Sequence, residues 1–353
     1  MGIIINLFKK TVTKVVLGVL VLIFLLSLFV FWGWYEKQYN KLWGFYYVYK
    51  GDKAYQSQKY QKAIDYYQSG LKYYPEHSKA QCNLGNIYVA FENYYAARDS
   101  YENALRYNPN FIICRMDLGI ILSERLANYD EAIQQYSKVI DSRPLLIHLP
   151  FVYNNINSVK DNKGIAYYNM GLAYKGKSVY MGERTLASHQ YLEKAKDAYI
   201  KAKKILKKDY DTHYNLALTN HLLGNYKDAG LEYCRAIEIS PEDYEAHYNL
   251  ALLLRTMKLY KESLDEFEKA GLILDIKGDT SKINYIYTVL NEVKQKIINQ
   301  GGYDYLENHR DSTAIDEQDI IYTRGKVLIP DKADDEMLKS FKSCPSKKYF
   351  NEM

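Results

Sequence analysis

Adjacent tyrosine and asparagine residues recur along the chain, at Tyr168-Asn169, Tyr214-Asn215 and Tyr248-Asn249. A side-chain amide both donates and accepts hydrogen bonds, so a row of amides can pair with the backbone of an extended peptide whatever its side chains are. A tyrosine ring beside each amide adds an apolar surface with a polar tip, which suits apolar or aromatic side chains of a partner. These residue types indicate binding of another polypeptide.

The residues most often used in catalysis lack a catalytic arrangement. His213 and His247 occupy the same position in two consecutive copies of an internal repeat, so we expect them to be packing residues. The sequence contains no phosphate-binding glycine loop, nucleophile elbow or H-E-x-x-H motif. The other histidines have no carboxylate or cysteine at ligand spacing. The sequence therefore predicts a protein that is not an enzyme, with no catalytic residue, metal site or cofactor.

Neither the cysteines nor the charges indicate a specialised site. Cys82, Cys114, Cys234 and Cys344 form no C-x-x-C pair and no zinc-ligand spacing. Because three of them lie in helical segments, where cysteine is commonly a small buried residue, we expect buried free thiols. The 47 basic and 42 acidic residues are spread along the chain, without the dense basic run of a nucleic-acid footprint.

The tyrosine and asparagine residues are positioned by an internal repeat with a period of about 34 residues. In residues 78–111 its landmarks lie on a first helix and then on and after a second: Leu84, Gly85 and Tyr88, then Ala97, Tyr101, Ala104 and Pro109. A small eighth residue and an alanine at the twentieth let the two helices approach closely, and the proline ends the second helix. This pattern resembles that of the tetratricopeptide repeat (TPR) family.

The same landmarks recur in further copies. A degenerate copy spans 44–77, another starts at Ile112, a stretched fourth copy carries about a dozen extra residues between its halves, and two consecutive copies span 210–243 and 244–277. The resemblance implies an all-α solenoid of about six repeats within residues 36–302. Pro150 and two asparagine pairs predict an irregular insertion at 145–163.

The sequence after the sixth repeat has two parts. Apolar residues at helical spacing follow a cap signal at Asp279 and predict a helix that caps the solenoid: Ile283, Ile286, Leu290, Val293 and Ile297. Residues 303–353 lose this periodicity, and we expect an irregular tail. A tail lying along the solenoid's own groove remains an alternative for that segment.

An apolar segment precedes the repeats. Residues 15–35 contain no charge and, at helical rise, match the roughly 30 Å core of a bilayer. The segment ends on Trp32, Trp34 and Tyr35, which suit the headgroup level and differ from the small residues of a cleavage site. We therefore expect an uncleaved transmembrane anchor in contact with the lipid bilayer, after a short N-terminal tail at 1–14.

Charge at the ends of the span bears on its orientation. Three lysines precede it and three follow it within fifteen residues, so the count is nearly balanced: Lys9, Lys10 and Lys14, then Lys37, Lys41 and Lys50. Because the first three are packed into a very short tail, they favour a cytoplasmic N-terminus. We therefore expect a single-pass membrane protein. In a bacterium it would lie in the inner membrane, with the solenoid on the periplasmic side.

The resemblance also implies where a partner binds, because the first helix of each TPR lines a concave groove. The residues that it places in this groove are Asn83, Asn86, Tyr168, Asn169, Tyr214, Asn215, Tyr248 and Asn249. Two alternatives remain open: the asparagines could bond only the neighbouring repeat or water, and the tyrosines could be core residues.

Together, anchor and repeats predict a membrane-tethered TPR scaffold that mediates protein-protein interactions in a membrane-associated or cell-envelope assembly. Secretion, envelope biogenesis and a periplasmic flagellar collar are examples that the resemblance implies. The expected partners are extended peptide segments or subunits of a membrane complex, and no nucleic acid. A receptor or adaptor for transported client polypeptides, or a regulatory recruiter of an enzyme partner, is the alternative.

Overall fold

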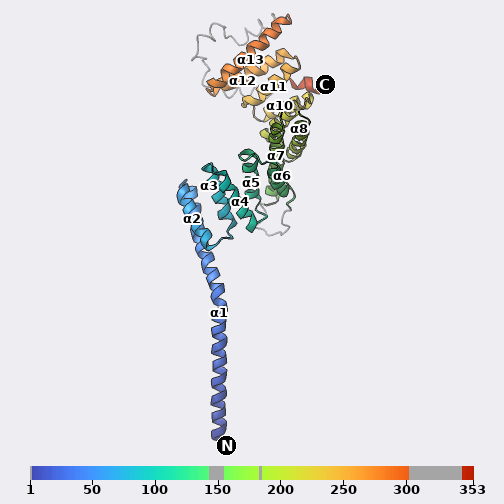
Figure 1. Ribbon diagram of the computed structural model, residues 1–353. Helices are drawn as coiled ribbons and strands as arrows, with labels where there is room; N and C mark the ends of the chain where they lie inside the picture. Colours follow the sequence, from blue (N-terminus) through green and yellow to red (C-terminus); the bar gives the residue numbers. More distant parts are fainter. Residues whose placement is uncertain (1, 143–154, 183–184, 302–343) are drawn as a thin grey trace. The chain divides into compact units, whose positions relative to one another are not determined.

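The computed structural model describes residues 2–142, 155–182, 185–301 and 344–353. Within these residues every regular element is a helix, as the predicted all-α fold requires (Figure 1). The chain divides into two compact units, residues 1–126 and 127–353, called unit 1 and unit 2 below.

Unit 1 consists of five helices: α1 (Gly2–Gln56), α2 (Tyr60–Tyr73), α3 (Ser78–Ala90), α4 (Tyr94–Tyr107) and α5 (Ile112–Glu124). Successive helices pack as hairpins around a core that includes Val48, Tyr67 and Ile87. The small eighth residue of each repeat is needed here, because a Cβ on Gly85 would lie 2.5 Å from the Tyr101 ring. This close approach explains why the repeat landmarks predicted the hairpins correctly.

Helix α1 joins the apolar segment to the first repeat without a break. Its Lys14–Gln56 stretch is long and apolar enough to cross a membrane, and no part of its most apolar window is buried. In Figure 1, α2 to α5 gather at the C-terminal part of α1, where Val48 and Ala54 enter the core. The first helix of the first repeat is therefore the continuation of the apolar helix.

Unit 2 contains the remaining described helices: α6 (Tyr129–Ile140), α7 (Asn155–Tyr180), α8 (Leu186–Ile205), α9 (Tyr210–Leu222), α10 (Tyr226–Ile239), α11 (Tyr244–Thr256), α12 (Tyr260–Ile276), α13 (Thr280–Asn299) and α17 (Lys347–Glu352). The turns inside repeats share one backbone device, a left-handed residue at equivalent positions, with φ of 78° at Gly224 and 64° at Lys258. Glycine adopts this conformation without strain. The predicted capping helix is confirmed as α13, whose apolar residues pack on α11 and α12.

Helix α7 corrects one expectation and explains another. Residues 155–163, for which irregular structure was expected, are the first turns of α7, whereas 145–154 lie outside the described residues. The extra length of the fourth repeat extends its helices to 26 residues in α7 and 20 in α8, against 13 and 14 in α9 and α10. The boundary between the units falls between α5 and α6, the two helices of the third predicted repeat.

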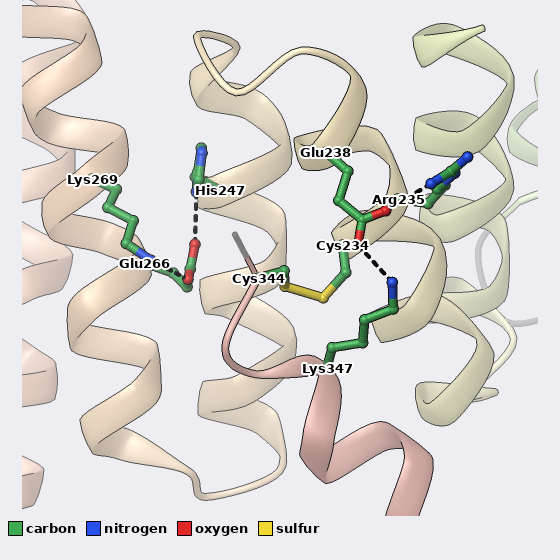
Figure 2. The surroundings of a disulfide bond; sticks show 8 residues. All are labelled: Cys234, Arg235, Glu238, His247, Glu266, Lys269, Cys344 and Lys347. Atoms are coloured by element: carbon green, nitrogen blue, oxygen red, sulfur yellow. Dashed lines mark hydrogen bonds and ion pairs between the residues drawn. A yellow bond between two sulfur atoms is a disulfide. The ribbon is translucent and has the colours of Figure 1, made fainter. Parts of the chain in front are cut away.

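The end of the chain is fastened to α10 by a disulfide between Cys234 and Cys344 (Figure 2). Phe350 of α17 is fully buried against Gly230, where a Cβ would lie 2.2 Å from its ring. Lys347 adds an ion pair with Glu238 at 2.6 Å. Residues 344–353 of the predicted tail thus pack on the second helix of the fifth repeat; 303–343 lie outside the described residues.

The expectation of four free thiols was wrong for this pair. The two cysteines are separated by 110 residues, and nothing in the repeat pattern brings them together. Cys82 and Cys114 are free and buried, as expected. A hydrogen bond with Cys82, together with burial, raises the pKa of the Cys114 thiol.

Candidate partner-binding face

The first helices of the last three repeats form one continuous face. It consists of equivalent residues of α7, α9 and α11 and is called the A-helix face below: Tyr168, Asn169, Leu172, Tyr214, Asn215, Leu218, Tyr248, Asn249 and Leu252. Asn215 Nδ2 donates to the Tyr168 hydroxyl at 3.2 Å, and Asn249 Nδ2 donates to the Tyr214 hydroxyl at 2.9 Å. Six of the eight residues predicted from the sequence therefore lie together here.

The asparagines of this face already serve the solenoid. Asn215 and Asn249 each donate to a backbone carbonyl one turn earlier, those of Asp211 at 3.0 Å and Glu245 at 2.9 Å. Lys175 Nζ donates to Asn215 Oδ1 at 2.6 Å. Asn169 is buried. Bonding to the neighbouring repeat, one of the two interpretations left open by the sequence, is thus present, and pairing with a bound peptide stays a prediction.

Apolar surface gathers on the same side of unit 2. The tyrosines and leucines of the A-helix face are half-buried. Leu222, one helical turn after Leu218, is 59% exposed. Tyr285 of α13, whose ring centroid lies 6.2 Å from that of Tyr248, is 61% exposed. By contrast, the described residues of α10 and α12 expose no large apolar side chain. Leu222 and Tyr285 therefore extend the A-helix face, while a second group of exposed apolar side chains lies at the end of α7 and the start of α8: Val179, Tyr180 and Leu186.

One edge of the A-helix face is acidic. Asp211 and Glu245 lie in the first turns of α9 and α11, where the helix dipole stabilises a carboxylate. Burial, and then the charges of Asp209, Asp243 and Glu245, raise the pKa of Asp211. Because these carboxylates repel one another, a cationic group from a partner would be favoured at this edge.

The two remaining predicted residues, Asn83 and Asn86, lie in unit 1. Asn83 Nδ2 donates to Asp52 at 3.0 Å and to the Tyr67 hydroxyl at 3.1 Å, while Lys79 pairs with Asp52 at 2.8 Å. Although burial opposes it, these hydrogen bonds lower the pKa of Asp52. Asn86 Oδ1 accepts from the Tyr101 hydroxyl at 2.5 Å. These amides belong to a polar network inside unit 1.

Buried tyrosine hydroxyls differ between the units. In unit 1, Tyr67 donates to Asp52 at 2.7 Å, and Tyr101 donates to Asn86. The equivalent hydroxyls of Tyr199 and Tyr233 are buried without a hydrogen-bond partner among the described residues. The cause is the ninth position of the first helix, which is polar in the first two repeats, Asp52 and Asn86, and leucine in the fourth and fifth repeats.

This difference predicts that the same substitution, tyrosine to phenylalanine, has unequal effects in the two units. Tyr67→Phe removes the donor to Asp52 and the acceptor of Asn83, and is expected to cost about 1–2 kcal/mol of stability. Tyr233→Phe removes a hydroxyl without a described partner and is expected to change stability by less than about 0.5 kcal/mol. Thermal unfolding and hydrogen exchange of the full chain measure both. Equal losses in the two variants would refute the assignment.

Sequence analysis missed two sets of residues that the repeat period could have identified. Asp117 occupies the place in α5 that Asn83 occupies in α3, and burial raises its pKa to about 6. Glu232 and Glu266, also one repeat apart, face His213 and His247, each at 2.6 Å from the histidine Nδ1. The two histidines were recognised as repeat residues, but their carboxylate partners were not.

The described residues contain no group of three or more histidine, cysteine or acidic side chains that could hold a metal ion. The interactions of the A-helix face are hydrogen bonds between side chains, aromatic contacts and charges. Such an arrangement can bind a polypeptide through apolar anchors and a cationic group.

Comparisons with known proteins agree with this architecture. Two family models, both described as tetratricopeptide repeat, match the chain: one at residues 50–110 and 82–146, the other at 210–243 and 244–270. A comparison with curated protein sequences gave no match.

Two solved structures share the fold. PilW, a type IV pilus biogenesis factor, is 15% identical over 70% of this chain and 98% of its own, with a TM-score of 0.52. PilF of Pseudomonas aeruginosa is 15% identical over 71% of this chain and 98% of its own, with a TM-score of 0.51. The family models thus identify tetratricopeptide repeats at residues 50–146 and 210–270, and the two solved structures share the fold that these repeats form.

Proposed function

We propose that this protein is a membrane-tethered scaffold that binds segments of other proteins along the A-helix face of unit 2. Mediating protein-protein interactions is the general role of its repeat family. The observation that carries the proposal is the apolar surface of the first helices: the half-buried leucines and tyrosines of the A-helix face continue into the exposed Leu222 and Tyr285, whereas α10 is covered by the chain's own C-terminus. A partner would therefore dock on the first helices.

The anchor in this proposal is helix α1. Its apolar window has no buried residue, so no protein core satisfies it, and a bilayer would. Its unbroken continuation into the first repeat supports an anchor that is retained. A cleaved signal sequence is the competing interpretation of such a helix.

The disulfide bears on the question of which side of the membrane unit 2 occupies. Disulfides persist in oxidising compartments and are rare in the cytosol. The Cys234–Cys344 bond therefore favours the extracytoplasmic side, which in a bacterium is the periplasm. The fold shared with a pilus biogenesis factor is in keeping with an envelope assembly. A receptor for client polypeptides or a recruiter of an enzyme would use the same face.

The apolar side chains and the acidic edge of the A-helix face indicate the chemistry of the partner. Half-buried tyrosine and leucine side chains favour a segment with apolar anchors, and the carboxylates of Asp211 and Glu245 favour a cationic group beside them. Asn215 and Asn249 each donate to a tyrosine of the preceding repeat and to a carbonyl of their own helix, and Asn215 Oδ1 accepts from Lys175. A bound peptide would therefore have to displace some of these bonds or use the amide oxygen of Asn249.

A matched pair of tyrosines tests the proposal. Tyr285 of α13 contacts Tyr248 and is 61% exposed, whereas Tyr287, two residues on, is 39% exposed and lies near Asp275 and Glu268 of α12. Tyr285→Asp is expected to weaken capture of partners cross-linked in intact membranes at least about tenfold, or roughly 1.4 kcal/mol. Tyr287→Asp should retain them. Equal capture by both variants and the wild type, quantified by mass spectrometry, would refute the assigned face.

A further inference from the structure

Unit 1 has an edge that faces the apolar half of α1. Helix α2 runs antiparallel to the C-terminal part of α1, so its C-terminus points back toward the apolar segment. The ring centroids of Trp43 and Tyr73 lie 6.5 Å apart, and those of Phe45 and Tyr74 lie 5.5 Å apart. Because the next hairpin has the same direction, the α2–α3 and α4–α5 turns both lie at this end of unit 1 (Figure 1).

A basic residue followed by a tyrosine occurs twice at this edge. Lys72-Tyr73 ends α2, and Arg106-Tyr107, at the same place in the next repeat, ends α4. All four side chains are exposed, with Tyr73 at 41% and Tyr107 at 44%. Tyrosine combined with lysine or arginine is the composition that suits the boundary between a bilayer and water. With two lysines of α1, they form what is called the basal edge below: Lys37, Lys41, Lys72, Tyr73, Arg106 and Tyr107.

The basal edge lies close to the expected position of the lipid headgroups. If the span ends at Tyr35, Trp43 lies eight residues, or about 12 Å of helix, beyond the hydrocarbon core. Because Tyr73 at the end of α2 lies beside Trp43, the α2–α3 turn lies at about the same height. Headgroups extend about 5–8 Å beyond that core. Long side chains at the turn cover most of the difference, and a helix tilt of about 20°, the average for single spans, brings one side of unit 1 closer still.

Charge specifies the kind of surface that the edge fits. The basal edge carries four basic side chains, whereas the carboxylates nearest to it in the sequence are Glu36, Glu76 and Glu102, of which Glu102 pairs with Arg98. Lys41 lies over the Tyr74 ring at 5.1 Å from its centroid, which holds the ammonium group at the edge. We propose that the basal edge binds the headgroups of anionic phospholipids, so that unit 1 rests on the membrane. This inference depends on the membrane anchor proposed above.

Hydrogen exchange of the full chain in nanodiscs tests the inference. We expect amides of residues 70–78 and 104–112 to exchange at least about threefold more slowly in discs that contain phosphatidylglycerol than in discs of phosphatidylcholine alone. The difference should disappear in Lys72→Ser/Arg106→Ser and in about 0.5 M salt, where the Debye length is only a few ångströms.

Lys59→Ser/Lys62→Ser is the matched control, because it removes two exposed lysines from the opposite end of the first hairpin. This variant should keep the lipid dependence. Residues 15–35 report on the anchor in the same experiment. If they are protected while the basal edge exchanges equally in both lipids, the inference is overturned and the anchor stands; if they exchange freely, the anchor itself fails.

Discussion

Replacing His247 with leucine is expected to lower the stability of the α11–α12 hairpin by about 3–5 kcal/mol, because it leaves a buried carboxylate without its main partner. His247 is fully buried, and its Nδ1 lies 2.6 Å from Glu266 Oε2 (Figure 2). Its Nε2 lies 3.2 Å from the backbone oxygen of Pro241. The histidine therefore links α12 to the turn that precedes α11.

The pH dependence has a defined sign. Although burial opposes it, the hydrogen bond and charge of His247, followed by the contribution of Lys269, lower the pKa of Glu266. A carboxyl with a lowered folded-state pKa contributes stability above its unfolded pKa, about 4.3, and loses it as the pH falls through the folded-state value. The difference between the wild type and His247→Leu should therefore be largest near neutral pH and shrink below about pH 4.

Two further variants separate charge from packing. His247→Leu/Glu266→Leu replaces both partners with apolar groups and is expected to recover most of the loss. His213→Leu breaks the equivalent pair with Glu232, whose side chain is 14% exposed against 2% for Glu266, so its effect should be smaller. Native-state hydrogen exchange of α9–α12 gives the local opening free energies. A loss in His247→Leu that the double variant does not relieve would mean that packing, not the buried charge, is the cause.

Breaking the Cys234–Cys344 bond is expected to release α17 from α10. The bond closes a 110-residue separation, and removing such a cross-link typically costs about 2–4 kcal/mol. Cys344→Ser leaves α17 with Phe350 in the gap beside Gly230 and with two contacts to acidic residues, Lys347 to Glu238 and Tyr349 to Glu262. These contacts join a helix of only six residues and are not expected to hold it alone.

Limited proteolysis and hydrogen exchange measure this release. Residues 344–353 should become labile in Cys344→Ser and stay protected in Cys82→Ser, which removes a buried free thiol from unit 1. The same chain reports on its compartment, because thiol labelling of protein from intact cells should find Cys234 and Cys344 oxidised. Reduced thiols at these two positions would contradict the extracytoplasmic location, and unchanged protection in Cys344→Ser would refute the fastening role.

The parts of the fold that local packing determines could be predicted from the sequence. Gly85 must face Tyr101 at van der Waals distance, and because the same requirement returns in successive repeats, the period identified the hairpins. The apolar spacing of α13 identified the capping helix. The helix at residues 155–163 could not be predicted in this way. Asparagine has only a weak preference against helix, and the segment continues into α7, where Gly164 packs against Leu206.

The remaining features depend on distances that a repeat pattern does not contain. The partner of Cys234 lies outside the period, so its bond could not be inferred. Whether an asparagine bonds its neighbour or a ligand depends on how close adjacent repeats come, and Asn249 reaches the Tyr214 hydroxyl at 2.9 Å. The acidic edge and the contrast between Tyr67 and Tyr233 likewise follow from contacts between side chains of different helices.

Site-specific photocross-linking in intact cells tests the central claim most directly. A photoreactive residue at Leu222 lies on the A-helix side of unit 2, and one at Lys227 lies exposed on α10, five residues later. Binding along the A-helix face predicts a discrete protein adduct at position 222 that Tyr285→Asp diminishes, and no adduct at position 227. An adduct at 227 with none at 222 would contradict the account.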